Sequence, residues 1–164
     1  AVLRSSATPM LLCNSHGSRA TGCKAPFLRI LVPLDGSETS HRAFPSAIDL
    51  AKAEGAEVIL LRVVDSGLHE GSEEFARIGR YLNRSADRFT DAGIKTTRLF
   101  VASGKPAATI LETLSEQRVD LVVMATHGRT GVDRLRLGSV AEEVLRHSPC
   151  PLLIVGGHEA TSAA

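Results

Sequence analysis

The chain has no tryptophan and one tyrosine among its 164 residues, and aromatic residues make up 4% of it. Proteins that bind single-stranded nucleic acid stack bases on aromatic side chains, so this scarcity argues against that class. Basic and acidic residues number 19 and 18, for a formal net charge of +1. A chain so balanced has no broad cationic surface for nucleic acid or an anionic membrane. We therefore expect neither as a partner.

Cysteine is scarce and irregularly spaced. Cys13, Cys23 and Cys150 form no CxxC pair and no metal-ligand spacing, and the six histidines show none either. This usage is typical of thiols in a reducing compartment, and it predicts no metal site built by the protein alone. No apolar run approaches the roughly 20 residues that span a bilayer. We expect a cytoplasmic protein without a transmembrane helix.

Length and composition predict one domain. With 43% hydrophobic and 23% charged residues, the chain can bury one core and is short for two. Residues 1–27 hold basic residues but no acid and show no sustained period, so we expect a mostly disordered extension. Arginine and serine without acids are also typical of an organellar targeting segment, and an incidental extension is the other interpretation. We expect residues 28–157 to form the domain and 158–164 to form a flexible tail.

From residue 28 onward two patterns alternate. Short apolar runs predict strands, and apolar residues at helical spacing predict helices. Pro45 predicts a kink or a late start in the first helix, which Gly55 ends. The alternation means right-handed crossovers, so the fold class is α/β, a five-stranded, doubly wound, Rossmann-like parallel sheet covered on both faces. The predicted strands are residues 28–34, 58–64, 96–102, 119–125 and 152–155.

Ligands of doubly wound sheets bind beyond the carboxyl ends of the strands. This rule selects the turns after Leu34, Val63 and Met124. Asp35 occupies the first turn, where its carboxylate can accept hydrogen bonds from a sugar hydroxyl or an amine, or help to hold a metal. It can equally cap the following helix. The residues alone leave both interpretations open.

The turn after Met124 combines glycine, arginine and serine. Glycine lets backbone amides approach an anion, and the free N–H groups of a helix N-terminus favour negative charge. The pattern favours a phosphate site, with ordinary turns and solvated charge as the alternative. It is neither a P-loop nor a GxGxxG motif. The residues concerned are Gly128, Arg129, Gly131, Arg134, Arg136, Gly138 and Ser139.

Three further segments of the sequence are ILVPLDGSE (30–38), GKPA (104–107) and SPCPLLIV (148–155). In this order they resemble the opening strand and turn, the third-helix entry and the last strand of the universal stress protein family. The resemblance covers nearly all of residues 28–157. The family's nucleotide motif, G-x2-G-x9-G-[ST], fits Gly128 and the Gly138–Ser139 pair. Ala125 stands where its first glycine is expected.

The resemblance implies an adenine nucleotide alpha hydrolase-like fold that binds ATP, and a Mg²⁺ ion would come with the phosphates. It places Pro33 and Asp35 near the nucleoside and the backbone of Val63 at the adenine edge. Ala125 in place of glycine costs little if its φ is negative and only close approach matters, and much if its φ is positive. The implied phosphate side comprises Ala125, Thr126, His127, Gly128, Arg129, Gly131, Gly138, Ser139 and Val140.

The expected function is a nucleotide-binding regulatory module of the stress response, acting on a signalling partner that the sequence does not identify. The alternatives are a slow ATPase or nucleotidyl-transfer enzyme of the same fold, and a nucleotide-free dimeric stress scaffold. No general base is evident, so we expect at most weak ATP hydrolysis and assign no catalytic residue. The resemblance also implies a homodimer through the last strand. The apolar residues 152–155 support this, because an open apolar edge strand aggregates.

Overall fold

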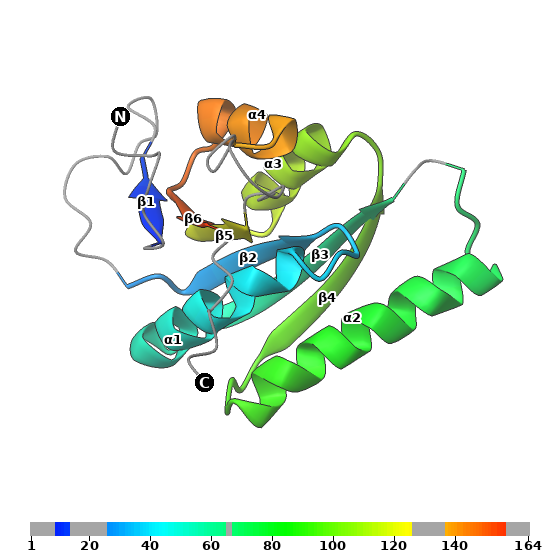
Figure 1. Ribbon diagram of the computed structural model, residues 1–164, viewed down its shortest axis with the longest axis horizontal. Coiled ribbons are helices and arrows are strands. Elements are labelled where there is room, and N and C mark those ends of the chain that lie inside the picture. Colours follow the sequence, from blue (N-terminus) through cyan, green and yellow to red (C-terminus); the bar gives the residue numbers. More distant parts are fainter. Residues whose placement is uncertain (1–8, 14–25, 65–66, 126–136, 157–164) are drawn as a thin grey trace, which may run out of the picture.

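The computed structural model describes residues 9–13, 26–64, 67–125 and 137–156. From β2 to β6, strands and helices alternate as expected, with a short 3-10 helix, η2, before α1 (Figure 1). The elements are β1 (Met10–Leu12), β2 (Arg29–Leu34), η2 (Ser40–Ala43), α1 (Phe44–Glu54), β3 (Glu57–Val64), α2 (Glu73–Asp91), β4 (Thr97–Ser103), α3 (Pro106–Glu116), β5 (Leu121–Ala125), α4 (Ser139–His147) and β6 (Leu152–Val155).

The strands form one sheet in the order β1-β6-β5-β2-β3-β4. Strands β2 to β6 pair in parallel, and the chain builds outward from β2 first through β3 and β4, then through β5 and β6. This confirms the α/β class and places the reversal of strand order between β2 and β5. The sheet has one strand more than the five we expected. Met10–Leu12, inside the segment expected to be mostly disordered, pairs antiparallel with β6.

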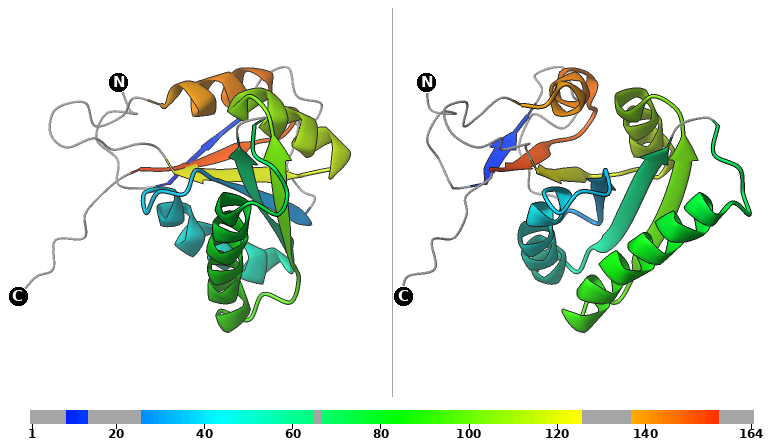
Figure 2. Two further views of the ribbon diagram at one scale, coloured as in Figure 1. Left: turned by 90° about the vertical axis from the view of Figure 1, so that its right-hand side faces the viewer. Right: turned by 45° about the vertical axis from the view of Figure 1, so that its right-hand side comes forward.

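Helices cover both faces of the sheet, α1 and α2 on one and α3 and α4 on the other (Figures 1 and 2). Successive side chains of a strand point to opposite faces, and the core is divided accordingly. Ile30 and Val32 pack with Phe44 of α1 and Phe89 of α2, whereas Leu31 packs on the side of α3 and α4. The apolar runs of the sequence are therefore strands buried on both faces, as parallel sheets require.

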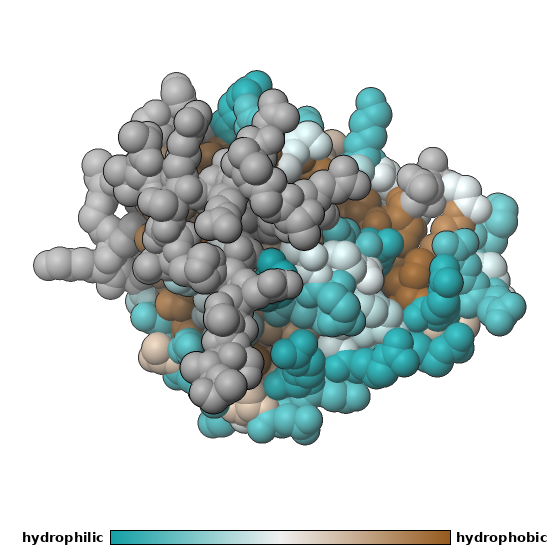
Figure 3. Space-filling model, in the orientation of Figure 1, coloured by the Kyte–Doolittle hydropathy of each residue, from teal (hydrophilic) through white to brown (hydrophobic). Residues whose placement is uncertain are grey.

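The predicted helix boundaries follow local signals. Helix α1 begins at Phe44 with Pro45 in its first turn, so the proline marks a late start and not a kink. Helix α2 begins where the Ser72 hydroxyl accepts a hydrogen bond from the Phe75 N–H at 3.1 Å. Its hydrophilic side chains gather along the outer surface (Figure 3). Within the described ranges, no helix is both long and apolar enough to cross a membrane.

The turn from β4 into α3 depends on Gly104. Its φ is +147°, and a Cβ at this position would lie 2.6 Å from the Thr109 hydroxyl oxygen. Only glycine fits such a conformation and such a close approach. Because the turn is tight, α3 starts directly at Pro106 and brings its first turns to the carboxyl end of the sheet.

Candidate functional site

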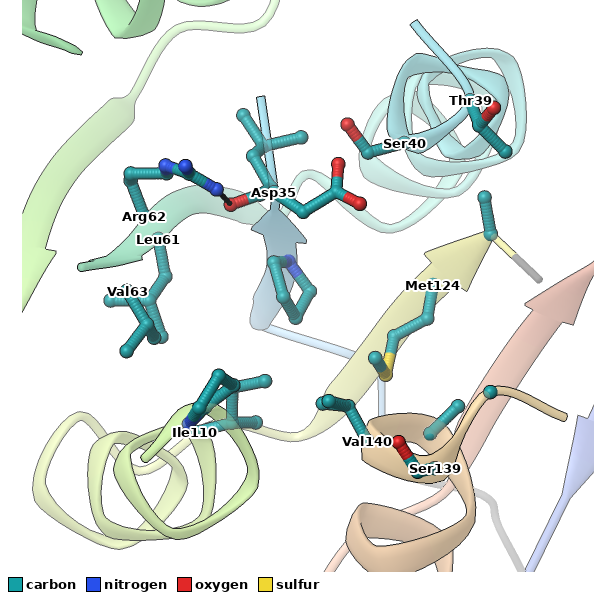
Figure 4. A pocket seen from close by; sticks show the side chains of 16 residues that line it. Asp35, Thr39, Ser40, Leu61, Arg62, Val63, Ile110, Met124, Ser139 and Val140 are labelled. Carbon is teal, nitrogen blue, oxygen red and sulfur yellow. Dashed lines mark hydrogen bonds between the residues drawn. The ribbon is translucent and has the colours of Figure 1, made fainter. Parts of the chain in front are cut away.

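A cavity of about 400 Å³ lies at the carboxyl ends of β2, β3 and β5, beside the first turns of α3 and α4 (Figure 4). Doubly wound sheets bind ligands at this position, and the volume suits a small molecule. The lining residues are Pro33, Leu34, Asp35, Thr39, Ser40, Leu61, Arg62, Val63, Pro106, Ile110, Met124, Ala125, Gly138, Ser139, Val140 and Ala141.

Every predicted site residue that the structure describes lines this cavity. These residues come from segments far apart in sequence, and they meet because the carboxyl ends of parallel strands share one edge of the sheet. They are Pro33, Asp35, Val63, Ala125, Gly138, Ser139 and Val140. The other predicted residues, Thr126, His127, Gly128, Arg129 and Gly131, lie outside the described residues. Their contact with phosphate stays a prediction.

Aliphatic side chains form much of the cavity wall. Leu61 and Val63 belong to β3 and Met124 to β5, while Ile110 of α3 approaches from the other side (Figure 4). This gives an apolar slot between a sheet and a helix, which suits a flat ring system such as a purine. The sequence predicted Ile110 only as a buried helix residue. That it faces the slot depends on how α3 packs on the sheet.

The N-terminus of α4 closes one side of the cavity. Gly138 is its N-cap, with φ −59° and ψ 152°, and no side chain caps the helix there. The first N–H groups of a helix lack partners within it and carry partial positive charge, so they suit an anion. Ser139 adds a hydroxyl at the same place. Any residue could adopt the Gly138 backbone, so the glycine matters for close approach and not for φ.

Asp35 organises the turn after β2. Its Oδ1 accepts hydrogen bonds from the Ser37 backbone N–H at 2.9 Å and from the Ser37 hydroxyl at 2.6 Å. This is a local Asx turn, and the residue that precedes η2 is Thr39, which makes no side-chain cap. Asp35 therefore shapes the turn and also presents a carboxylate to the cavity. The sequence left two interpretations of Asp35 open, a ligand contact and a helix cap. The N-cap of η2 is Thr39, so Asp35 does not take the capping position.

Arg62 lies on the rim of the cavity and was not among the predicted site residues. Its Nη1 donates to the Leu34 carbonyl at 3.2 Å. The guanidinium carbon is 3.5 Å from the position that a Cβ on Gly36 would take, so the side chain lies against the turn. The sequence signal that could have identified Arg62 as a site residue is its position as a single arginine in the otherwise apolar run 58–64. Arg62 and Val63 also line an adjoining cavity of about 260 Å³.

A hydrogen-bonded cluster supports the Asp35 turn from α2. The Tyr81 hydroxyl lies 2.8 Å from Nε2 of His41 and 3.4 Å from Oγ of Ser40, which lines the cavity. The Ser40 hydroxyl donates to the Ser37 carbonyl at 2.7 Å. Burial raises the pKa of Tyr81 above its ordinary value of 10.0, the Ser40 hydrogen bond opposes this, and the Asp35 charge adds to it.

The backbone conformation at Ala125 shows why a residue other than glycine fits at this position of the family motif. Ala125 is the last residue of β5 and pairs in parallel with Val155 of β6. Strand residues have negative φ, and the non-glycine with positive φ in the described part of the chain is Arg118. An alanine is therefore unstrained here. The backbone part of the condition under which the substitution costs little is met.

The described residues contain no cluster of three or more histidine, cysteine or acidic side chains able to hold a metal ion. Asp35 is the carboxylate among the described residues that line the cavity. A divalent cation at this site would therefore need ligands from the nucleotide or from residues outside the described ranges.

Comparison with known proteins points to one family. A universal stress protein of Methanocaldococcus jannaschii is 33% identical over 139 residues, which are 79% of this chain and 82% of the relative. A universal stress protein solved in complex with cAMP matches with a TM-score of 0.66 and 29% identity, over 79% of this chain and 97% of that one.

A universal stress protein of Archaeoglobus fulgidus in complex with dAMP has a TM-score of 0.63 over 79% of this chain and 98% of that one. At 17% identity it shows likeness of fold alone. Structural neighbours thus include complexes with adenine nucleotides. The family model for universal stress proteins matches residues 26–156, nearly the whole of the sheet and its helices. The chain belongs to the universal stress protein family.

Proposed function

We propose that the cavity binds an adenine nucleotide, with ATP preferred, and that the protein is a nucleotide-binding regulatory module of the stress response. The observation that carries the proposal is the convergence of three features in one cavity: an apolar slot, a carboxylate and a helix N-terminus. These match the base, the sugar and the phosphate of a nucleotide. The cAMP complex of a relative at 29% identity supports the same ligand class.

The slot between Val63, Met124 and Ile110 suits the adenine ring, because aliphatic side chains can cover both faces of a flat base. Asp35 is exposed, and a carboxylate has about four lone-pair sites. It can therefore accept a hydrogen bond from a ribose hydroxyl while it holds Ser37. The nucleoside would then lie along the ends of β2 and β3.

The phosphates would lie at the N-terminus of α4, where the backbone amides after Gly138 and the hydroxyl of Ser139 can donate to them. The preference for ATP rests on the family motif, whose Gly128 and arginine-rich segment lie outside the described residues. The ligands cAMP and dAMP each carry one phosphate, so their complexes do not explain a preference for a triphosphate. We therefore assign that preference to the segment that contains Gly128. A Mg²⁺ ion would come with the phosphate chain.

Regulation requires that the nucleotide stabilise one conformation of the protein or of a complex. The Tyr81, His41 and Ser40 cluster links the cavity wall to α2, and so offers a route from the ligand to the outer surface. A signalling partner would read that change. We also propose a cytoplasmic location, because the odd number and irregular spacing of the three cysteines are typical of thiols in a reducing compartment.

The test is native mass spectrometry of freshly purified protein with extraction of the bound nucleotide, followed by calorimetric titration with ATP, ADP, AMP and cAMP. We expect stoichiometric nucleotide and tighter binding of ATP than of the monophosphates. If the protein purified without nucleotide and gained no thermal stability from millimolar ATP, the result would favour the alternative function, a nucleotide-free stress scaffold.

A slow ATPase is distinguished by turnover. We expect bound Mg-ATP to be retained without multiple turnovers, because Asp35 is engaged by Ser37 and no neighbouring base is apparent among the described residues of the cavity. Multiple turnovers that Asp35→Ala abolishes, with binding preserved, would assign slow hydrolysis to the site.

We further propose that the protein forms a homodimer in which β6 of one copy pairs with β6 of the other. The apolar sequence of Leu152–Val155 favours such pairing. A two-fold axis makes the pairing antiparallel by symmetry. Within one chain, however, the outer edge of β6 already carries β1.

A further inference from the structure

The guanidinium of Arg62 lies across the turn that carries Asp35. Its Nη1 donates to the carbonyl of Leu34, the last residue of β2, at 3.2 Å. On the other side of Asp35, a Cβ placed on Gly36 would lie 3.5 Å from the guanidinium carbon and 3.5 Å from Nη2. The side chain therefore lies against the residues directly before and after Asp35. In Figure 4 it approaches the backbone of the turn, while the Asp35 carboxylate points toward Ser40.

Gly36 permits this close arrangement. Its φ is +86°, a left-handed conformation that glycine adopts without strain. Because it has no side chain, the flat guanidinium can lie close to the backbone of the turn. Arg62 is half-buried, and the Leu34 carbonyl is its hydrogen-bond acceptor within the described ranges. Arg62 therefore restricts the backbone on both sides of Asp35.

The Asp35 side chain is held separately, by Ser37. Oδ1 of Asp35 accepts hydrogen bonds from the Ser37 N–H at 2.9 Å and from the Ser37 hydroxyl at 2.6 Å. The Ser37 carbonyl in turn accepts a hydrogen bond from the Ser40 hydroxyl at 2.7 Å. Asp35 is exposed, so packing alone would leave its carboxylate several rotamers. Arg62 and Ser37 together fix the carboxylate before a ligand arrives.

We propose that Arg62 is a positioning residue: by holding the backbone beside Asp35, it makes the cavity select adenine nucleotides with ribose hydroxyls over nucleotides without them. This rests on the proposed function, in which Asp35 accepts a hydrogen bond from the ribose. A hydrogen bond weakens steeply as its angle departs from linearity, so the direction of the carboxylate matters. A carboxylate that is already ordered also lowers the entropic cost of binding. Arg62 thus acts on the ribose through Asp35.

Calorimetric titration of the whole chain with ATP and with 2′,3′-dideoxy-ATP tests the proposal. The two ligands carry the same base and the same phosphates, so the ratio of their affinities isolates the ribose hydroxyls from any effect of charge on phosphate binding. The wild type should bind ATP roughly tenfold more tightly or better. Arg62→Met, which keeps a long side chain without donors, should lower this ratio to about threefold or less. Arg62→Lys, which keeps the charge and a donor, should give an intermediate ratio.

Two further variants show whether Arg62 acts through Asp35. Arg84→Met removes one positive charge from the exposed surface of α2 and should leave the ratio at the wild-type value. Asp35→Ala removes the acceptor and should lower the ratio by itself. Arg62→Met added to Asp35→Ala should then lower the ratio no further, because the two residues act as one unit. Additive effects of the two substitutions would contradict the proposal.

Other outcomes also decide the matter. Retention of the wild-type ratio in Arg62→Met would overturn the role of Arg62. Equal affinities of ATP and 2′,3′-dideoxy-ATP for the wild type would overturn this inference alone, since the cavity would still bind a nucleotide. If the wild type bound neither ligand, the proposed function would fail as well.

Thermal unfolding of each variant shows whether the substitution is tolerated. If Arg62→Met does not fold, Arg62→Gln takes its place in the same comparison, because the shorter amide side chain also loses the guanidinium. Loss of folding in both variants would overturn the proposal, since Arg62 would then be required for the fold as a whole.

Discussion

The hydroxyl of Tyr81 lies 2.8 Å from Nε2 of His41, and their rings stack with an interplanar angle of 16°. Tyr81 belongs to α2 and His41 to η2, so this contact joins a long surface helix to the turn that carries Asp35. Ser40, next to His41, lines the cavity and lies 3.4 Å from the same hydroxyl. The cavity and α2 are thus connected through the hydroxyl of Tyr81.

We predict that Tyr81 titrates later in the folded protein than in the unfolded chain. Its pKa is raised above 10.0, mainly by burial, so the folded state holds the phenol proton where the unfolded state has lost it. Stability should be unaffected below pH 10 and fall as pH rises through the folded pKa. Because the chain has one tyrosine and no tryptophan, ultraviolet absorbance of tyrosinate reads this residue alone.

The control for this titration is Tyr81→Phe, which removes the titrating group. The variant should lose less stability than the wild type as the pH rises above 10. At neutral pH its free energy of unfolding should be lower by about 0.5–1.5 kcal/mol, because a hydrogen bond is lost. A native midpoint equal to or below that of the urea-unfolded protein would contradict the assignment.

Gly138→Val should weaken nucleotide binding at least tenfold, or about 1.4 kcal/mol. The backbone at Gly138 tolerates a side chain, so the loss would come from blocked approach to the α4 amides. The matched control is Gly79→Ala in α2, where an added Cβ meets nothing within 4 Å. It should raise stability by about 0.5–1 kcal/mol and leave affinity unchanged. If the two variants bound the nucleotide with equal affinity, the phosphate would not lie at the N-terminus of α4.

Ala125→Gly, which restores the family motif, should change nucleotide affinity by less than about threefold. Ala125 is extended and paired with Val155, so its side chain imposes no strain that glycine would relieve. The glycine should instead cost about 0.5–1 kcal/mol of stability, measured by urea unfolding, through backbone entropy. A tenfold gain in affinity would show that the Ala125 methyl obstructs the ligand.

Thr97→Val should stabilise the protein by about 1 kcal/mol. Thr97 opens β4 opposite Val58, and its buried Oγ1 has no hydrogen-bond partner among the described residues. Valine keeps the shape and the β-branch and removes the cost of the buried hydroxyl. Thr97→Ser, which keeps the hydroxyl and loses the methyl, is the control and should be less stable. Destabilisation by valine would indicate that a water satisfies the hydroxyl.

The elements that the sequence predicted are those with strong local signals. Pro45 and Gly55 bounded α1, and the apolar run that became β6 was predicted at its observed limits. Strand β1 was missed because three residues cannot show a period, and because the force that orders them is the open edge of β6, about 140 positions away in sequence. The lining residues Arg62 and Ile110 were missed as site residues for a related reason, since their position depends on packing.

The alternation of strands and helices, the turns able to hold a ligand, and the glycines and serine suited to an anion could all be predicted from the amino-acid sequence. These are local properties, set by the period of apolar residues and by backbone preference. The folded chain was needed to show that Asp35, Val63, Ala125 and Gly138 line one cavity and that β1 pairs with the edge of β6. Such contacts join distant segments, and they exist only once the sheet has set its strand order.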